Sequence, residues 1–261
     1  MLHRADADGL VVIGQPAHAW VSGQLARAWG NARFGAVAPR EAVCLGAEQH
    51  DVGWTAWEGA PAHNPRTGRP YTFMELPTGI HLGLWSAAVP SALTQSRYAA
   101  LLVSLHGTGL YERHDYARDT PEEARGVRDF LARSYALQDD LLAGLRADPA
   151  YAPHATPEVI ARNRRLVAVW DALSLALCMG LGGERTYPDV PAAAGAETLV
   201  LAPLDGVPTR VAVRPWPFGA DAVRLVCEGR RLPETFDDDE ALRAALARAP
   251  WVTIETRLEP A

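Results

Sequence analysis

The stretch TPEVIARNRRLVAVWDALSLALCMGL, residues 156–181, sets an acidic side chain between two apolar runs. Thr156 suits the N-cap of a helix and Glu158 its first turn, so we expect one long helix to begin here. Asp171 shares a face with Val167 and Leu175, and its apolar neighbours on both sides make a solvated carboxylate implausible. A buried carboxylate needs a compensating charge, which either a metal ion or a nearby arginine can provide.

The composition sets the broad class of the protein. The chain has 261 residues, 48% of them hydrophobic and 21% charged, with a net charge of −6. These values are typical of a folded domain and count against a nucleic-acid partner held by a basic surface. Three distant cysteines give neither a zinc-thiolate pair nor a disulfide framework. No segment has the apolar length of a signal peptide or a membrane span, so we expect a cytoplasmic protein without a membrane partner.

Helical periodicity dominates the chain upstream of this stretch. A capping box of Thr120 and Glu123 opens one long amphipathic segment, which we interpret as a helix pair. The other expected helices span 16–29, 39–57, 81–89 and 97–111.

After residue 180 the apolar period changes to two, which is typical of strands. Four antiparallel strands are expected within 197–204, 209–216, 221–232 and 251–260, and we expect short strands from residues 1–14 to join them. The prediction is a mainly α fold: a single domain over 1–261, with a helical body over 16–180 and a small antiparallel β-sheet appendage over 195–260.

The stretch CLGAEQHDVGWTAWEG, residues 44–59, contains a His-Asp pair in the second expected helix. Placed on a helix, His50 and Asp51 share an inward face with Val43, Ala47 and Trp54. Two ionisable side chains on such a face need partners, and a cation satisfies both.

Other expected helices each direct a histidine inward on an apolar face, namely His18, His81 and His106. Taken singly, a buried histidine is more often a hydrogen-bonded core residue than a metal ligand. Asp171 taken alone can equally pair with Arg164 or Arg165. The coincidence of so many inward ionisable groups favours a shared metal site, made from His18, His50, Asp51, His81, His106 and Asp171.

The order of His18, the His50-Asp51 pair and a distant Asp171 followed by ALSLAL resembles the HD superfamily of metal-dependent phosphohydrolases. The resemblance covers roughly residues 16–180 and implies a helical fold, and His81 and His106 resemble the two extra histidines of its dinuclear members. It implies that Asp51 bridges two divalent ions, with His18, His50 and Asp171 completing one site and His81 and His106 serving the other. A water shared by two such ions becomes the nucleophile for attack on phosphorus, which makes Asp51 the catalytic residue.

The chain as a whole also resembles an uncharacterised bacterial family that shares QPxHA, HDVGW, TGRP and LLVSLH. Two positions depart from HD patterns: Gly53 and Trp54 stand where many members have Lys or His, and Gln15 and Pro16 replace a Tyr upstream of His18. Three functions stay open: a phosphohydrolase, a mixed-valent di-iron oxygenase of HD fold, and a metal-binding module without catalysis. Ligands of this type suit Fe, Mn, Zn, Ni, Co or Mg, and the pattern does not choose among them.

The Pro- and Gly-rich segment over residues 58–80 is long for a connection, and such segments often carry function. It contains Arg66 and Arg69, and the segment WGNARF adds Asn31. Guanidinium and amide groups suit a phosphate or carboxylate, so these three residues are candidate contacts to an anionic small-molecule substrate. Solvent-facing loop arginines are the alternative interpretation. The sequence gives no oligomeric state.

Overall fold

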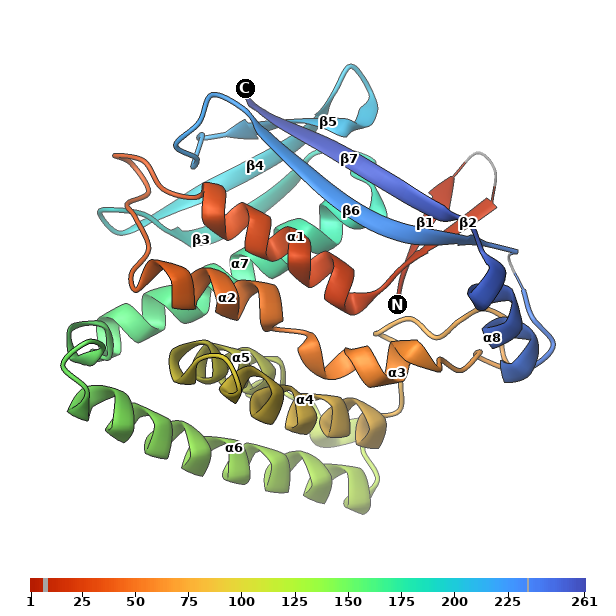
Figure 1. Cartoon of the computed structure of the whole chain (residues 1–261), viewed down its shortest axis with the longest axis horizontal. Helices are drawn as coiled ribbons and strands as arrows, with labels where there is room; N and C mark the ends of the chain where they lie inside the picture. Colours follow the sequence, from red (N-terminus) through yellow and green to blue (C-terminus); the bar gives the residue numbers. More distant parts are fainter. Residues whose placement is uncertain (7–8, 234) are drawn as a thin grey trace.

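The computed structural model describes residues 1–6, 9–233 and 235–261. A seven-stranded sheet lies over a stack of helices, with the long helix α6 on the side far from the sheet (Figure 1). About half of the residues are helical and 22% are in strands.

The sheet is mixed and curled, with the strand order β1-β2-β6-β7-β5-β4-β3. All neighbouring strands are antiparallel except β5 and β7, which pair in parallel. The strands are β1 (Leu2–Asp6), β2 (Gly9–Ile13), β3 (Arg185–Pro191), β4 (Ala196–Leu204), β5 (Val207–Arg214), β6 (Val223–Leu232) and β7 (Trp251–Pro260).

The helices form layers beneath the sheet, with α1 and α7 directly against it and α2, α4 and α5 between these two and α6 (Figure 1). Among the described residues, none of the helices has the length and apolar character needed to cross a membrane. The helices are α1 (Gln15–Ala28), α2 (Arg40–Gln49), α3 (Thr55–Gly59), α4 (Thr78–Leu93), α5 (Arg97–Tyr111), α6 (Pro121–Ala147), α7 (Pro157–Met179) and α8 (Asp239–Arg248), with the short 3-10 turns η1 (Val52–Trp54), η2 (Tyr116–Arg118) and η3 (Ala152–His154).

Specific polar contacts tie α1 and α7 to the sheet. The side-chain amide of Gln24 donates to the carbonyl of Val226 at 2.8 Å and accepts from its N–H at 2.9 Å. It therefore satisfies both backbone groups of this β6 residue. Arg4 of β1 donates to the carbonyls of Leu177 and Cys178 at the end of α7, at 3.2 and 3.0 Å. These contacts satisfy backbone groups that would otherwise be buried without partners.

The prediction of a mainly α fold with a small β appendage is wrong. The seven strands share one continuous hydrophobic core with α1 and α7, in which Ile13, Leu225 and Leu258 of the sheet pack with Leu25 and Trp170 of the helices. The N-terminal strands do join the C-terminal ones, because β2 pairs with β6. The extent of the sheet was missed because β3 lies in a segment rich in Gly, Pro and charge, which resembles a connection.

The prediction of one helix over 39–57 is also wrong. Helix α2 ends at Gln49, His50 is its C-cap, and Asp51 leaves the helical conformation with φ −107° and ψ 19°. The chain then makes the turn η1 before the short helix α3. The apolar pattern continues through this break because both sides of the break face the same interior, so periodicity alone did not reveal it.

Two helix starts agree with the sequence. Thr120 and Glu123 form the expected capping box, and the Thr156 side chain accepts from the N–H of Val159. The segment after Thr120 is one continuous helix, α6, and not the expected pair. Helix α8 was not expected.

Gly53 sets how closely η1 approaches α4. A Cβ atom at this position would lie 2.0 Å from the carbonyl oxygen of Leu84 and 3.1 Å from Cβ of Ala88. The backbone of α4 cannot move away as a flexible side chain would, so only glycine allows this contact. The approach places the aromatic residues of α4 beside the His-Asp pair.

We expect Gly53→Ala to lower the free energy of unfolding by about 3 kcal/mol, because the added methyl group overlaps the α4 backbone. Gly83→Ala is the matched control, since that exposed helical position leaves open space for a Cβ and should gain about 0.5–1 kcal/mol. Urea unfolding of both variants measures the difference. Equal stability of Gly53→Ala and wild type would contradict the close approach.

Candidate metal centre

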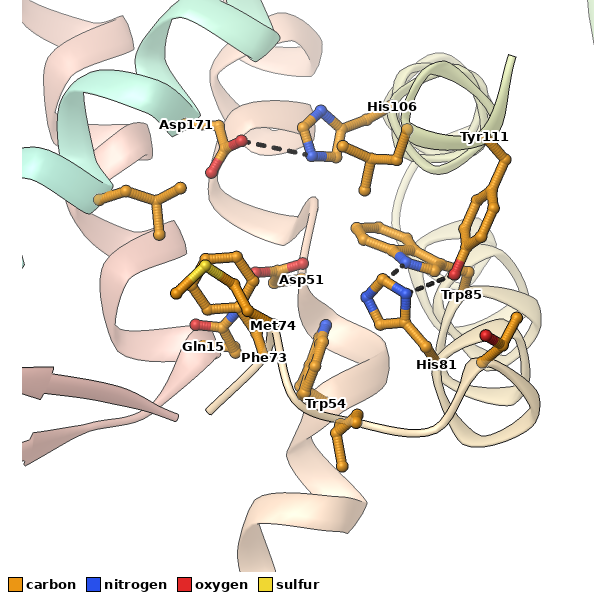
Figure 2. Close-up of a pocket in the computed structure, with 14 residues that line it drawn as sticks. Gln15, Asp51, Trp54, Phe73, Met74, His81, Trp85, His106, Tyr111 and Asp171 are labelled. Carbon is orange, nitrogen blue, oxygen red and sulfur yellow. Dashed lines mark hydrogen bonds and ion pairs between the residues drawn. The ribbon is translucent and has the colours of Figure 1, made fainter. Parts of the chain in front are cut away.

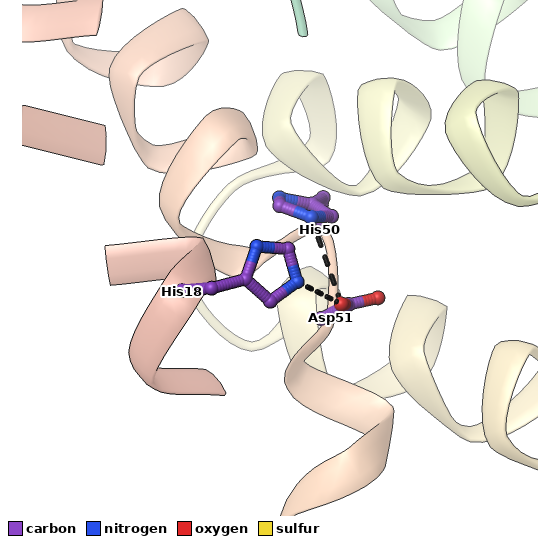
Figure 3. A group of neighbouring side chains, drawn as sticks. All are labelled: His18, His50 and Asp51. Carbon is purple, nitrogen blue, oxygen red and sulfur yellow. Dashed lines mark hydrogen bonds and ion pairs between the residues drawn. The ribbon is translucent and has the colours of Figure 1, made fainter. Parts of the chain in front are cut away.

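Five of the six expected ligands meet where four elements converge. His18 comes from α1, His50 and Asp51 from the end of α2, His106 from α5 and Asp171 from α7. Figure 3 shows His18 and His50 directed at Asp51, and Figure 2 shows His106 directed at Asp171. All three rings are buried, and the Asp51 and Asp171 side chains are only 5% and 16% exposed. A solvated face would not gather these groups.

The ligating atoms form two overlapping groups, one of His18, His50 and Asp51 and one of His50, His106 and Asp171. Within each group the atoms lie within 4.8 Å of one another. Nε2 of His18 is 2.7 Å from Oδ2 of Asp51, Nε2 of His50 is 3.4 Å from Oδ1 of Asp171, and Nε2 of His106 is 3.7 Å from Oδ2 of Asp171. Ligands at 2.0–2.2 Å from one ion lie at most about 4.4 Å apart, so small movements suffice to surround a cation.

Hydrogen bonds on the opposite ring nitrogens orient two of the histidines. Nδ1 of His50 donates to the carbonyl of Ala47 at 2.7 Å, and Nδ1 of His18 lies 2.9 Å from the hydroxyl of Ser174. That hydroxyl donates to the carbonyl of Asp171, so it accepts from His18. Both rings therefore present Nε2 to the centre, the arrangement usual for metal-ligating histidines.

His50 carries the clearest sign that the centre needs a cation. Among the described residues, its buried Nε2 makes no hydrogen bond of normal geometry, and the nearest acceptors are Oδ1 of Asp171 at 3.4 Å and Oδ2 of Asp51 at 3.7 Å. An unpaired buried nitrogen lone pair beside two carboxylates is costly unless a proton or a metal ion occupies the space. Imidazole and carboxylate ligands without thiolate suit a divalent transition metal, so the residues fit one.

Without a metal ion, the pKa values of the histidines and carboxyls show that the centre still requires a positive charge. Burial disfavours the charged form of His50, but the charges of Asp51 and Asp171 outweigh it and raise its pKa to about 9. Burial also disfavours ionised Asp51 and Asp171, yet the adjacent histidines lower the pKa of both carboxyls. Burial and then the charge of His50 lower the pKa of His106 to about 4. One proton on His50 thus substitutes for a cation between the carboxylates.

His81 lies outside both groups of ligating atoms. Its Nε2 accepts from the indole N–H of Trp85 at 3.2 Å, and its Nδ1 is hydrogen-bonded to the hydroxyl of Tyr111 (Figure 2). An indole N–H can only donate, so the neutral ring carries its proton on Nδ1 and donates it to Tyr111. Both ring nitrogens are occupied, and His81 forms part of a pocket wall.

That pocket, which we call the aromatic pocket, has a volume of about 340 Å³ and opens onto Asp51, His106 and Asp171 (Figure 2). Its walls are largely aromatic and aliphatic, and the polar groups among them are Gln15, Thr78, His81 and Tyr111. None of the described residues that line it is a lysine or arginine. The lining comprises Gln15, Asp51, Trp54, Phe73, Met74, Leu76, Thr78, His81, Trp85, His106, Leu110, Tyr111, Asp171 and Leu175.

The three expected substrate contacts lie elsewhere. The Asn31 side chain donates to the carbonyls of Trp216 and Phe218 and accepts from the N–H groups of Arg33 and Phe34, so it has a structural role in its loop. Arg66 and Arg69 follow Asn64 in a turn closed by the N–H of Gly68 to the carbonyl of Asn64, and neither lines the aromatic pocket.

A family model described as "Protein of unknown function (DUF3891)" matches residues 1–234. The chain belongs to this family. The match confirms the expected relation to an uncharacterised family, and it spans the helices α1 to α7 together with β1 to β6. It gives no support for membership of the HD superfamily. No curated protein and no solved structure gives a significant match.

Sequence reasoning missed the residues that support and surround the ligands. Ser174 has a sequence signal, because it lies three residues after Asp171, about one helical turn, on a segment that the sequence analysis had already singled out. Tyr111, Phe73 and Met74 have none, since nothing local distinguishes an aromatic pocket wall from core. Gln15 was noted only as a departure from HD patterns.

We expect Ser174→Ala to weaken metal binding about 10- to 100-fold, because it removes the acceptor that orients His18. Zn²⁺, which binds such sites tightly, is a suitable probe for titration calorimetry. Ser91→Ala is the control, since this exposed residue lies outside the centre and its hydroxyl donates to the carbonyl of Ala87 in its own helix. Unchanged Zn²⁺ affinity in Ser174→Ala would contradict the role of Ser174 in orienting His18 for metal binding.

Proposed function

We propose that this protein is a metal-dependent hydrolase of the HD type that cleaves a phosphate ester with a dinuclear centre. The observation that carries the proposal is the convergence of His18, His50, Asp51, His106 and Asp171 in the order that the HD resemblance implies. The orphaned Nε2 of His50 supports it further.

The ligand set has five members in this proposal, with His81 left in the pocket wall. His50 has one available lone pair and belongs to a single ion, because Ala47 holds its other nitrogen. A second ion would be held by His106 together with Asp171 or Asp51. Bound divalent ions would supply an activated water molecule and polarise the scissile group.

The residues of the aromatic pocket orient the substrate and exclude water. Trp54, Phe73 and Trp85 offer flat apolar surfaces for the organic part of the ester. Tyr111 accepts from His81, so its own O–H is available to donate to a bound oxygen. Burial raises the pKa of the Tyr111 hydroxyl and keeps it protonated.

One observation favours the alternative of a mixed-valent di-iron oxygenase. The described lining of the aromatic pocket has no arginine or lysine to bind a phosphate, and it suits an apolar substrate better. The absence of a Tyr upstream of His18 counts against this reading. The same ligands serve either chemistry, so metal identity separates the two.

Metal content tests the ligand assignment. We expect His106→Ala to lose about half of the bound metal, because it removes a ligand of the second group, whereas His81→Ala should keep full metal content. Elemental analysis of protein purified without chelator measures both. Loss of metal in His81→Ala with retention in His106→Ala would contradict the assignment.

Turnover tests the reaction class. We expect wild-type protein loaded with Mn²⁺, Ni²⁺ or Zn²⁺ to hydrolyse bis(p-nitrophenyl) phosphate, and Asp51→Asn to reduce the rate to background because metal binding is lost. Glu48→Gln, in α2 three residues before Asp51 and outside the centre, is the control. Iron with a mixed-valent EPR signal and no hydrolysis would point to the oxygenase, and a chain that binds no metal would overturn both.

A further inference from the structure

A second hollow meets the candidate metal centre from the other side. It has a volume of about 610 Å³, lies between α5 and α7, and shares His106, Leu110 and Asp171 with the aromatic pocket. We call it the arginine groove, because Arg113, Arg164 and Arg165 line it. The centre thus opens onto two hollows of different chemistry.

The groove follows from helical spacing on two helices. On α7, Arg164 precedes Asp171 by seven residues, which is two turns along one face and about 10 Å. Arg113 follows His106 by seven residues, just beyond the end of α5. Each helix therefore offers a candidate ligand at one end of the groove and an arginine toward the other.

The groove stays open because its floor is made of small residues. Gly109 and Ala168 line it between the ligands and the arginines, and Ala161 lines it one turn beyond Arg164. A Cβ atom at Gly109 would lie 3.1 Å from Nη2 of Arg164, which places that guanidinium directly over the floor. A larger side chain here would displace the arginine.

The positive charge of the groove is only partly balanced. Arg164 donates to Glu112 at 2.6 Å in an ion pair whose side chains are about one-third exposed, and such pairs open easily. Arg165 is held by the carbonyls of Pro188 and Asp189. Among the described residues, Arg113 has neither a hydrogen bond nor an ion pair, so its guanidinium is available.

We propose that the arginine groove binds a second anionic group of the substrate, about 10 Å from the group held at the metal centre. The substrate is then an elongated molecule with two separated anionic groups, phosphate or carboxylate. This inference rests on the proposed function for the reaction of the group held at the metal centre, whereas binding of the remote anion does not require that reaction. Arg113 and Arg164 determine specificity by contacting the remote anion as charge-assisted donors.

Two phosphonates test this, because their C–P bonds resist hydrolysis. One is hexylphosphonate, and the other is a six-carbon chain with a phosphonate at each end. Calorimetry on Zn²⁺-loaded protein under nitrogen should show that the bisphosphonate binds about tenfold more tightly. Arg113→Gln and Arg164→Gln should each lose most of that preference while binding hexylphosphonate unchanged.

Arg118→Gln is the matched control, since this exposed arginine lies close in sequence but does not line the groove. Gly109→Val is a second test, because it fills the floor of the groove without removing a charge. This variant should also abolish the tighter binding of the bisphosphonate. A six-carbon chain with a phosphonate at one end and a carboxylate at the other distinguishes a remote carboxylate from a remote phosphate.

Equal binding of both phosphonates by wild type, or a preference that survives in Arg113→Gln and Arg164→Gln, would overturn the groove as a subsite. Failure of the proposed hydrolase is a separate result. In that case no phosphate ester is turned over, while the preference for two anions persists.

Discussion

The structure depends on burying two carboxylates beside three imidazoles at the meeting point of α1, α2, α5 and α7. An ionised carboxylate in an apolar interior is strongly destabilising unless a positive charge lies beside it. Asp51 and Asp171 share such a charge, held as a proton on His50 when no metal is bound. The four helices pack through one hydrophobic core, and this packing brings their polar residues to the same place.

The sheet provides the rigid support for this convergence. Two of the helices that carry candidate ligands, α1 and α7, are bonded to strands through Gln24 and Arg4. The ligands thus sit on helices fixed from both sides, by the sheet above and by α5 and α2 below (Figure 1). Ligand groups on rigid elements are held more exactly in place than groups on loops. The sheet is therefore part of the site's architecture.

Much of the site was predictable from sequence, and less of the fold. His18, His106 and Asp171 could be identified as inward-facing because their neighbours at helical spacing are apolar, and such neighbours mark the buried face of a helix. The break after His50 was not predictable, since it depends on the approach of α4 to Gly53. The role of His81 also depends on distant partners, Trp85 across one turn and Tyr111 on another helix. The extent of the sheet was underestimated because β3 was not recognised as a strand, and the parallel pairing of β7 with β5 was missed because a long-range pairing has no local signal.

The number of metal ions decides which substrate the aromatic pocket can accept. With neutral imidazoles, one divalent ion balances Asp51 and Asp171, and the centre attracts no anion. Two divalent ions leave an excess of positive charge, which compensates for the lack of arginine and lysine among the described residues of the pocket. Under the proposed function, this charge balance favours the dinuclear form for binding a phosphate ester. The groove lined by Arg113 and Arg164 is the one place near the centre where the described protein itself supplies that charge. Under the two proposals together, an anionic substrate would be attracted from two sides, by the ions at the scissile group and by the arginines at its remote end.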